Sequence, residues 1–384
     1  KNPKLDTWTA TGSFKGQGTS SDHYGLSAHN IDIKCSGGFQ FSDGTSNSKY
    51  AYDDNTIAEN YFNIKLNVAS SENANNALLQ DEFNEYCPYM PEGKKKSAYK
   101  VTLPDGSEKT RYHVRTTMGF SPCVVFIKET DINQAVVFTK PGDQNSFHFY
   151  GCGDFGNSKK NKNTMGMDKN NEKECIMEVS DNTTPQCLFQ DTDVFTRNSD
   201  GQIQKDEDGL VVGAGFEIRY EWSADEKPLL DYPEGADEKK KQEIDTQNAE
   251  IKKQNVQIVA HNQEVNLQNF TNWQKAVEFI FNARNKYENA KTAYNSAGED
   301  TKVELKAKLD TAIDEIKKEF PTHFAVDSLL FLYLFTERHL MTDNRAKNTF
   351  YHTSDGQIWD VCYDYDNDTA EGIDNEGALS FDYG

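Results

Sequence analysis

The sequence has no long hydrophobic run and comparatively little positive charge. Its longest apolar stretch, residues 329–335, is far shorter than the roughly 20 residues that a helix needs to cross a bilayer, so we expect no membrane-spanning helix. Lys and Arg number 41 against 62 Asp and Glu, which gives a net charge of −21. This balance argues against nucleic acid as the main partner, because neutralising phosphates requires clustered Lys and Arg.

The patterns of zinc sites, disulfide frameworks and common phosphate loops are also missing. The seven cysteines are an odd number without a C-x-x-C pair, so we expect them to be small buried apolar side chains. The eight histidines are scattered without an H-E-x-x-H pattern, and His339 is expected to pack within a helix. Neither G-x-x-x-x-G-K-[ST] nor G-x-G-x-x-G occurs.

At 384 residues the chain is long enough for one large domain or for two to three smaller ones. We predict a β-rich part over residues 1–223, a helical, coiled-coil-like part over 237–320, and a core helix with a hairpin over 321–384. Lys1 at the start and a motif that continues toward Gly384 lead us to expect trimmed ends, so a signal peptide cannot be judged.

The β-rich part is predicted from short stretches in which polar and apolar residues alternate, as they do in half-buried strands. Strands are expected at residues 30–34, 61–68, 99–103, 111–117, 123–128, 135–139, 147–150, 175–179 and 216–222. A helix is expected within 70–92, where serines precede an apolar periodicity and Pro88 follows it. The glycine-rich stretch 150–156 is expected to form a turn, although it contains the letters D-F-G.

The helical part carries two rows of residues that repeat every seven positions. The apolar row is Ile244, Ile251, Ile258 and Val265, and the second row is Asn248, Asn255 and Asn262. Such a repeat indicates a coiled-coil seam, in which buried Asn costs stability but fixes the register. The partner is either another copy of the chain, docked through 240–268, or the second helical run, 301–320, folded back as a hairpin. The Pro- and acid-rich segment 224–236 is expected to be a linker.

Near the C-terminus, oxygen ligands are interleaved with aromatic residues between positions 341 and 377. The side chains concerned are Asp343, Asn348, Asp360, Asp364, Asp366, Asp368 and Asp374. A solvated acidic tail lacks aromatic and β-branched residues because it cannot bury enough apolar surface. This stretch therefore predicts carboxylates mounted on folded segments, as in a site for metal ions.

The order of these residues predicts which of them meet. Asp343 and Asn348 form D-x-x-x-x-N after an apolar helix expected over 324–340. A hairpin with its turn at 354–356 then leads to Asp364 and Asp366, so its two ends lie close together. Phosphoryl transfer uses such a set, in which one Asp orients the hydroxyl nucleophile while an Asn and a second Asp hold Mg²⁺.

The segment resembles the CotH kinase-like family, whose members carry an Asp, an Asn that begins a Tyr-rich strand, an aromatic-Asp-x-Asp motif and a glycine. The matching positions are Asp343, Asn348 to Tyr351, Tyr363 to Asp366, and Gly372. The stretch from Gly16 to Ser21 resembles the family's Gly- and Ser-containing turn, and Lys65 resembles its phosphate-facing lysine. Tyr363 replaces the usual Trp, and Lys65 has no assigned glutamate partner, with Glu72, Glu82 and Glu85 as options.

The resemblance implies an α+β, atypical protein-kinase-like two-lobe fold, with a β-rich N-terminal lobe and a helical C-terminal lobe that carries the coiled-coil-like insertion. It implies transfer of the γ-phosphate of ATP to protein Ser or Thr, with Mg²⁺ or Mn²⁺. It also implies an extracellular, spore-surface or virion location. The residues concerned are Asp343 as the catalytic group, Lys65, Gly16, Gly18, Ser20 and Ser21 toward the phosphates, and Asn348, Asp364 and Asp366 toward the metal.

Two alternatives remain open. Asp364, Asp366 and Asp368 are spaced like positions 1, 3 and 5 of an EF-hand loop, which suggests structural Ca²⁺, although Thr369 and Asn375 replace the expected Gly and Glu. The fold could also be a catalytically silent scaffold, in a surface or phage-tail-type virion protein that forms homo-oligomers through 240–268. A fold alone does not decide between these functions.

Overall fold

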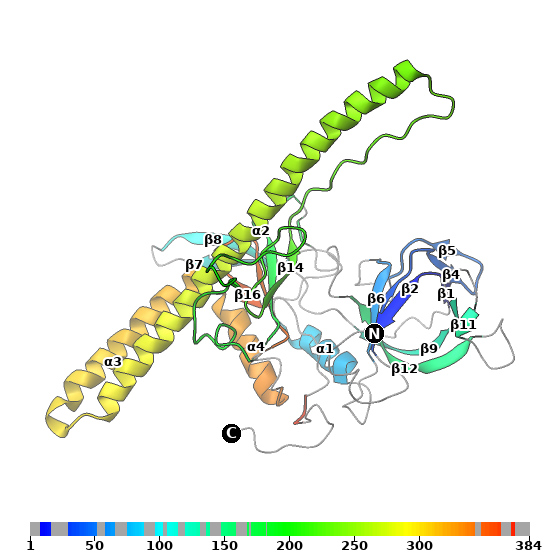
Figure 1. Cartoon of the computed structure of the whole chain (residues 1–384). Coiled ribbons are helices and arrows are strands. Elements are labelled where there is room, and N and C mark those ends of the chain that lie inside the picture. Colours follow the sequence, from blue (N-terminus) through cyan, green and yellow to red (C-terminus); the bar gives the residue numbers. More distant parts are fainter. Residues whose placement is uncertain are drawn as a thin grey trace.

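The computed structural model describes residues 8–16, 30–51, 58–65, 75–87, 97–102, 106–113, 120–130, 136–138, 147–158, 167–168, 170–181, 183–341, 347–361 and 370–372. Within these ranges the chain is mixed α+β, as predicted, with strands concentrated in the N-terminal half and long helices toward the C-terminus (Figure 1). No helix of these ranges is long and apolar enough to cross a membrane.

The described residues of the N-terminal half form twelve strands and helix α1 (Asn75–Tyr86). The strands are β1 (Trp8–Ala10), β2 (Ser13–Gly16), β3 (Ile31–Lys34), β4 (Phe39–Phe41), β5 (Ser46–Asn47), β6 (Tyr61–Lys65), β7 (Ser97–Thr102), β8 (Glu108–His113), β9 (Phe120–Ile127), β10 (Glu129–Thr130), β11 (Val136–Phe138) and β12 (His148–Asn157). They form a five-stranded sheet in the order β2-β3-β6-β12-β9, a three-stranded sheet in the order β1-β4-β5, and the pairs β7-β8 and β10-β11.

The C-terminal half contains a second large sheet and the long helices. Its elements are β13 (Cys175–Val179), β14 (Phe216–Glu221), α2 (Glu238–Asn295), α3 (Glu299–Glu319), the 3-10 turn η2 (Phe320–Thr322), α4 (Val326–Arg338), β15 (Thr349–Thr353) and β16 (Asp360–Val361). The sheet order is β14-β13-β15-β16. Strands β13 and β14 precede residue 223 but belong to the same sheet as β15 and β16. The predicted boundary at residue 223 therefore does not separate the five-stranded sheet from the C-terminal sheet.

The first core lies between the five-stranded and three-stranded sheets. Alternate residues of β3, β6 and β12 supply Ile31, Phe62, Ile64 and Phe155 to this core, where Phe39 of β4 joins them. The rings of Phe62 and Phe155 stack with their centroids 4.6 Å apart. The alternation that predicted half-buried strands at 30–34 and 61–68 therefore fills one face of the sheet, as expected.

The glycine-rich stretch 150–156 is not a turn, as the sequence had suggested, but the middle of β12. It pairs with β6 on one side and with β9 on the other, so that Asp154 lies opposite both Lys65 and Pro122. A β-bulge between Phe149 and Gly151 interrupts the pairing with β9. Glycine within a strand is common beside such a bulge, and this explains how a glycine-rich segment occupies the interior of a sheet.

The second core lies between the C-terminal sheet and the middle of α2. Trp273 of α2 is fully buried, and its ring centroid lies 4.9 Å from that of Trp359, 5.0 Å from that of Tyr351 and 5.7 Å from that of Phe216. Helix α2 thus supplies the centre of this core. The predicted helical insertion over 237–320 is therefore an integral part of the C-terminal half.

Helix α3 folds back along the C-terminal part of α2, as the hairpin alternative had predicted (Figure 1). Leu309 and Ala312 of α3 are buried, and Lys286 of α2 forms an ion pair with Glu315. The hairpin does not extend to residues 240–268, because α3 has only 21 residues. The heptad rows in the first half of α2 consequently have a different partner.

That partner is the predicted linker, which runs extended along α2 in the opposite direction. Each Asn of the polar row pairs with one backbone unit of this segment: Asn262 with Ala224, Asn255 with Lys227 and Asn248 with Leu230. In every pair the Asn Oδ1 accepts from the backbone N–H and the Nδ2 donates to the C=O of the same residue, at 2.8 to 3.0 Å. We call this the Asn ladder.

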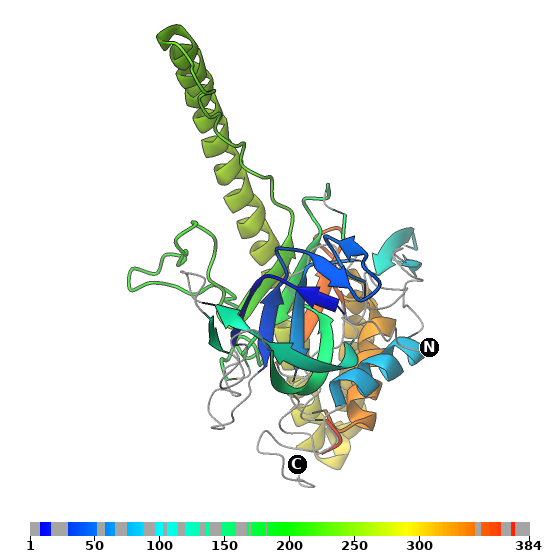
Figure 2. The same cartoon turned by 90° about the vertical axis from the view of Figure 1, so that its right-hand side faces the viewer.

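The Asn ladder joins a period of seven in the helix to a period of three in the extended segment. Seven helical residues advance about 10.5 Å, and three residues of a nearly fully extended chain span about the same distance. Residues 224–262 therefore form an arm of one helix and one clasped segment, which projects from the rest of the molecule (Figures 1 and 2). The predicted coiled-coil seam is thus occupied by the chain itself.

We expect Asn255→Leu to release the centre of the arm while leaving the two cores folded. The substitution removes both hydrogen bonds to Lys227, each worth about 0.5–1.5 kcal/mol. Hydrogen exchange of residues 225–229 should become about 10-fold faster. Gln254→Leu is the matched control, because the hydrogen bonds of Gln254 go to the side chains of Lys227 and Glu250 and not to the backbone of the extended segment. Equal exchange in the two variants would contradict a role for the Asn ladder.

Helix α4 is less buried than the predicted core helix. One face buries Leu332, Phe335 and Thr336, and Phe335 packs on Phe83 of α1 with ring centroids 4.9 Å apart. The opposite face leaves Leu330, Tyr333 and Leu334 each more than half exposed. An apolar composition therefore predicted burial on all sides, whereas only the side toward α1 and β16 is covered.

Candidate functional site

The structure describes three of the nine predicted site residues, namely Gly16, Lys65 and Asn348. The other six, Gly18, Ser20, Ser21, Asp343, Asp364 and Asp366, lie outside the described residues.

Gly16 is the last residue of strand β2, where it is exposed and pairs with Ile31 of β3, and the rest of the predicted turn lies outside the described residues. Gly12, which directly precedes β2, has a packing reason for being glycine. A Cβ added to it would lie 1.9 Å from the carbonyl oxygen of Lys34. The glycine at position 12 is therefore required by the close approach of β3.

Lys65 lies on the face of the five-stranded sheet that points away from the first core. The same face carries Asp32 of β3, Asn63 of β6 and Asp154 of β12, because these residues alternate with the core residues of their strands. Asp154 is the cross-strand neighbour of Lys65, and Asp32 is that of Asn63. All four side chains are buried, with exposures of 3 % for Asp32, 0 % for Asn63, 4 % for Lys65 and 1 % for Asp154.

A buried polar face of this kind is costly unless its groups find partners or a ligand. The Tyr61 hydroxyl donates to Asp32 Oδ2 at 3.2 Å. The Asn63 carboxamide has no hydrogen-bond partner for either its oxygen or its nitrogen in the part of the chain that the structure describes. A buried amide with both functions unsatisfied fits a face that receives a polar ligand.

Of the three glutamates considered as partners of Lys65, the structure shows Glu82 in contacts with other residues. Glu82 of α1 pairs with Arg338 of α4 at 3.2 Å and lies 3.4 Å from His339 Nε2, and Glu85 is exposed. Glu72 falls in a range without described geometry. His339 is buried, as predicted, but it caps the C-terminus of α4 and does not lie within the helix. The carboxylate opposite Lys65 is that of Asp154. The sequence did not predict this pairing, because residues 150–156 were expected to form a turn.

Asn348 introduces the predicted hairpin, which the structure confirms. Strands β15 and β16 pair in antiparallel fashion, with Tyr351 opposite Val361. The connecting turn contains Gly356 with a φ of 73°, a backbone conformation that glycine adopts without strain. Asn348 itself is buried and has a positive φ of 57°, which Asn tolerates better than most residues. The chain therefore turns sharply just before β15.

A second buried polar cluster, which sequence reasoning also missed, surrounds His352 of β15. Its Nε2 lies 2.9 Å from Glu174 Oε1, and its Nδ1 lies 3.2 Å from Asp360 Oδ1. The three side chains have exposures of 0 % for His352, 1 % for Glu174 and 0 % for Asp360. No local pattern marks this cluster, because Glu174 comes from a loop that is distant in the sequence.

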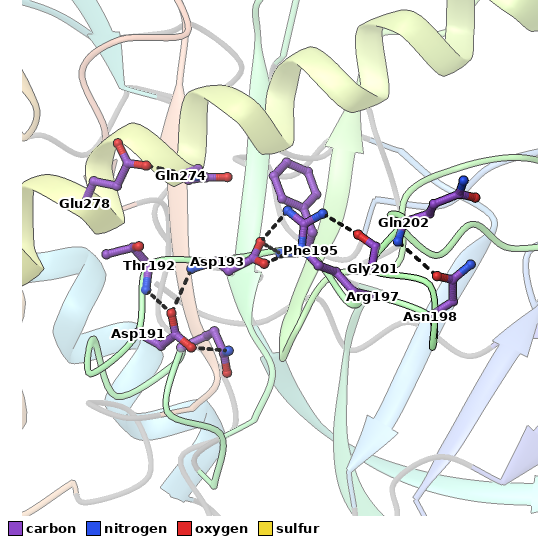
Figure 3. Close-up of polar contacts among 11 residues, drawn as sticks. Asp191, Thr192, Asp193, Phe195, Arg197, Asn198, Gly201, Gln202, Gln274 and Glu278 are labelled. Atoms are coloured by element: carbon purple, nitrogen blue, oxygen red, sulfur yellow. Dashed lines mark hydrogen bonds and ion pairs between the residues drawn. The ribbon is translucent and has the colours of Figure 1, made fainter.

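A third polar cluster lies on the loop between β13 and β14, beside α2 (Figure 3). The Arg197 guanidinium forms an ion pair with Asp193 and donates a hydrogen bond to the carbonyl of Gly201 at 2.9 Å. The hydrogen bond from Arg197 lowers the pKa of Asp193 below its usual value. Asn198 Oδ1 accepts from the backbone N–H of Gln202 at 2.9 Å. These exposed contacts join neighbouring turns of one loop, and we assign them a structural role.

The cysteines behave mostly as predicted. The six that the structure describes are free thiols, of which Cys35, Cys87, Cys175 and Cys187 are buried. Burial raises the pKa of Cys35 to about 11. Among the described residues, no group of three His, Cys, Asp or Glu side chains is arranged to hold a metal ion.

No protein-family model matches the chain, and no curated protein matches it. The candidate site consists of the buried polar face around Lys65 and of the hairpin that begins after Asn348.

Proposed function

We propose that this chain is a CotH-like phosphotransferase that moves the γ-phosphate of ATP to a Ser or Thr of a protein substrate. In this proposal the N-terminal sheets form one lobe of a kinase-like fold, and the C-terminal sheet with its helices forms the other. The observation that carries the proposal is the buried polar face on which Lys65 lies between two aspartate-bearing strands.

The charges on this face suggest how a phosphate would be held. The ammonium group of Lys65 shares this face with two carboxylates, those of Asp154 opposite it and of Asp32 opposite Asn63, so the cluster alone does not attract an anion. A divalent cation such as Mg²⁺ or Mn²⁺ would supply the missing positive charge and bridge the phosphate oxygens. The Asn63 carboxamide would then find partners in the same ligand. We therefore expect nucleotide binding to depend on the metal.

The roles of the remaining residues follow from the resemblance to the CotH kinase-like family. Asp343 would orient the acceptor hydroxyl and take its proton, and Asn348 with Asp364 would hold the metal. Asn348 fits such a role because it is an amide oxygen fixed at the buried start of β15. Asp366 would support the metal, while Lys65 and the stretch that contains Gly16, Gly18, Ser20 and Ser21 would contact the phosphates.

The proposal predicts that Lys65→Met loses metal-dependent ATP binding. Wild type should show a thermal shift with ATP and Mn²⁺ together but not with ATP alone. The variant should bind at least about 10-fold more weakly, because a hydrogen bond to a charged group is worth about 1.5–3 kcal/mol. Lys34→Met is the control, since Lys34 is exposed on neighbouring β3. The readout is the shift on adding ligand, so that a lower starting stability of the variant does not affect it.

Two results would contradict the proposal. One is a thermal shift with Ca²⁺ alone and none with ATP plus Mg²⁺ or Mn²⁺, which favours the structural calcium alternative. The other is equal ATP binding by wild type and Lys65→Met. A separate assay addresses the metal ligands, because equal phosphate incorporation by wild type and Asp364→Ala would refute the assignment of Asp364.

The projecting arm favours a second candidate function, that of a catalytically silent assembly protein on an extracellular, spore or virion surface. The arm extends away from both cores and exposes Val256, Leu229 and Tyr232 (Figure 2). Such a projection suits contact with a neighbouring molecule, including another copy of the chain. Light scattering tests this alternative, since a monomeric protein would remove the homo-oligomer through 240–268.

A further inference from the structure

His261 lies at the inner end of the arm, where three segments of the chain meet. It belongs to α2 and directly precedes Asn262, which pairs with Ala224 in the innermost rung of the Asn ladder. Trp222, two residues before Ala224, packs against the imidazole with ring centroids 5.2 Å apart. The third segment is the loop before β13, from which Glu172 reaches the imidazole. The side chain is therefore placed to hold both parts of the arm against the rest of the protein.

Each ring nitrogen of His261 faces a carboxylate. Nε2 lies 3.1 Å from Glu172 Oε1, and Nδ1 lies 3.5 Å from Oε2 of Glu264, which is three residues further along α2. Among the described residues, these two glutamates are the charged groups that face the imidazole, and Trp222 is uncharged. A protonated imidazole donates from both nitrogens, whereas the neutral form has one N–H and no charge. Protonation therefore allows His261 to bind both glutamates at once.

The loop that carries Glu172 is itself fixed to the C-terminal sheet. Asn171 Nδ2 donates to the carbonyl of Ser354, in the turn between β15 and β16, at 2.8 Å. The next polar contact of α2 goes to a different loop, since Gln263 donates to the carbonyl of Asp208 at 2.8 Å. That amide-to-carbonyl contact carries no charge that pH could change. The contact between His261 and Glu172 thus joins α2 to an anchored loop and depends on a titratable group.

We propose that His261 is a pH-sensitive latch, which in its protonated form ties the inner end of the arm to the loop before β13. This inference concerns the attachment of the arm and does not depend on the proposed phosphotransferase activity. Its consequence is that the arm is held more firmly in acidic than in alkaline solution. The pH would then set how freely the arm presents its exposed side chains to a neighbouring molecule.

The pKa of His261 indicates where this change falls. The hydrogen bond with Glu172 raises the pKa above 6.5, desolvation lowers it by less, and Glu264 raises it further. The latch is therefore fully present below pH 6.5 and is lost as the pH rises through the raised pKa. Because all three groups are exposed, we expect a modest effect of about 2- to 5-fold, which is the range for ion pairs on a protein surface.

The test compares wild type with Glu172→Gln, Glu264→Gln and His261→Lys between about pH 5.5 and about pH 8.5, where exposed carboxylates stay ionised. Glu264→Gln is the matched control, because Glu264 faces the same imidazole from α2 itself and does not join the arm to another segment. His261→Lys keeps its positive charge over the whole range. The measured quantities are the hydrogen-exchange protection factors of the Ala224 and Glu174 amides, corrected for the intrinsic effect of pH on exchange. An NMR titration of the imidazole locates its pKa.

In wild type, both protection factors should fall by about 2- to 5-fold as the pH rises, with the midpoint at the measured pKa of His261. Glu264→Gln should keep this step at a lower pH, whereas Glu172→Gln and His261→Lys should show flat profiles. A wild-type profile without a step, or equal profiles of wild type and Glu172→Gln, would overturn the proposal. A step of wild-type size in His261→Lys, or its loss in Glu264→Gln, would do the same.

Discussion

Trp273→Ala is expected to destabilise the C-terminal half by about 3–5 kcal/mol, the usual cost of truncating a large buried aromatic side chain. Trp273 is completely buried, and its ring contacts Trp359, Tyr351 and Phe216, which come from three different segments. Removal of the indole leaves a cavity that these side chains cannot fill without moving the sheet relative to α2. The effect is a large fraction of the 5–15 kcal/mol that stabilises a typical domain.

Guanidinium unfolding, followed by the fluorescence of the remaining tryptophans, measures this loss. Tyr333→Ala is the matched control, because Tyr333 is an aromatic residue of α4 that is more than half exposed. Its truncation should change the free energy of unfolding by no more than about 0.5 kcal/mol. A loss below about 1 kcal/mol for Trp273→Ala would mean that α2 is not part of the C-terminal core.

Phe62→Ala is expected to cost a similar amount, about 3–5 kcal/mol, but in the N-terminal half. Phe62 is fully buried in β6, where it stacks on Phe155 and contacts Phe39 at a centroid distance of 6.0 Å. Its strand also carries Asn63 and Lys65 on the opposite face. Loss of the first core should therefore disturb the candidate site as well, because the same strand positions both.

Hydrogen exchange of β6 and of residues 270–280 separates the two cores. Phe62→Ala should accelerate exchange in β6 more than in α2, and Trp273→Ala should do the reverse. Phe126→Ala is the control for the N-terminal half, since Phe126 belongs to the same sheet but is more than half exposed. Equal acceleration of both regions by both variants would show that the two cores unfold as one unit.

Local patterns were sufficient to predict the elements whose own residues decide their conformation. Strand β13 was predicted at 175–179, where the structure has it, because a short apolar run is bounded by polar residues on both sides. The helical character of 237–340 followed from its periodicity. The hairpin around Gly356 followed from its turn residues, since such a turn needs a glycine at positive φ.

Features that depend on distant partners were not predictable in the same way. The alternation of β3 and β6 is typical of strands with one solvated face, and nothing in it reveals that Asp32, Asn63 and Lys65 are buried. The pairing of His352 with Glu174 joins residues that are far apart in the sequence. The rows of Asn and Ile in α2 correctly indicated a partner for the helix but could not distinguish another helix from an extended segment.

The Asn ladder has a consequence for how freely the arm can change its sequence. Each asparagine recognises the amide and carbonyl of a backbone unit, so Ala224, Lys227 and Leu230 could be replaced by other residues without losing the paired hydrogen bonds. Proline is the exception at these three positions, because it has no N–H. The arm can therefore display different peptide sequences on one constant frame, which makes residues 224–232 a suitable place to graft a foreign epitope.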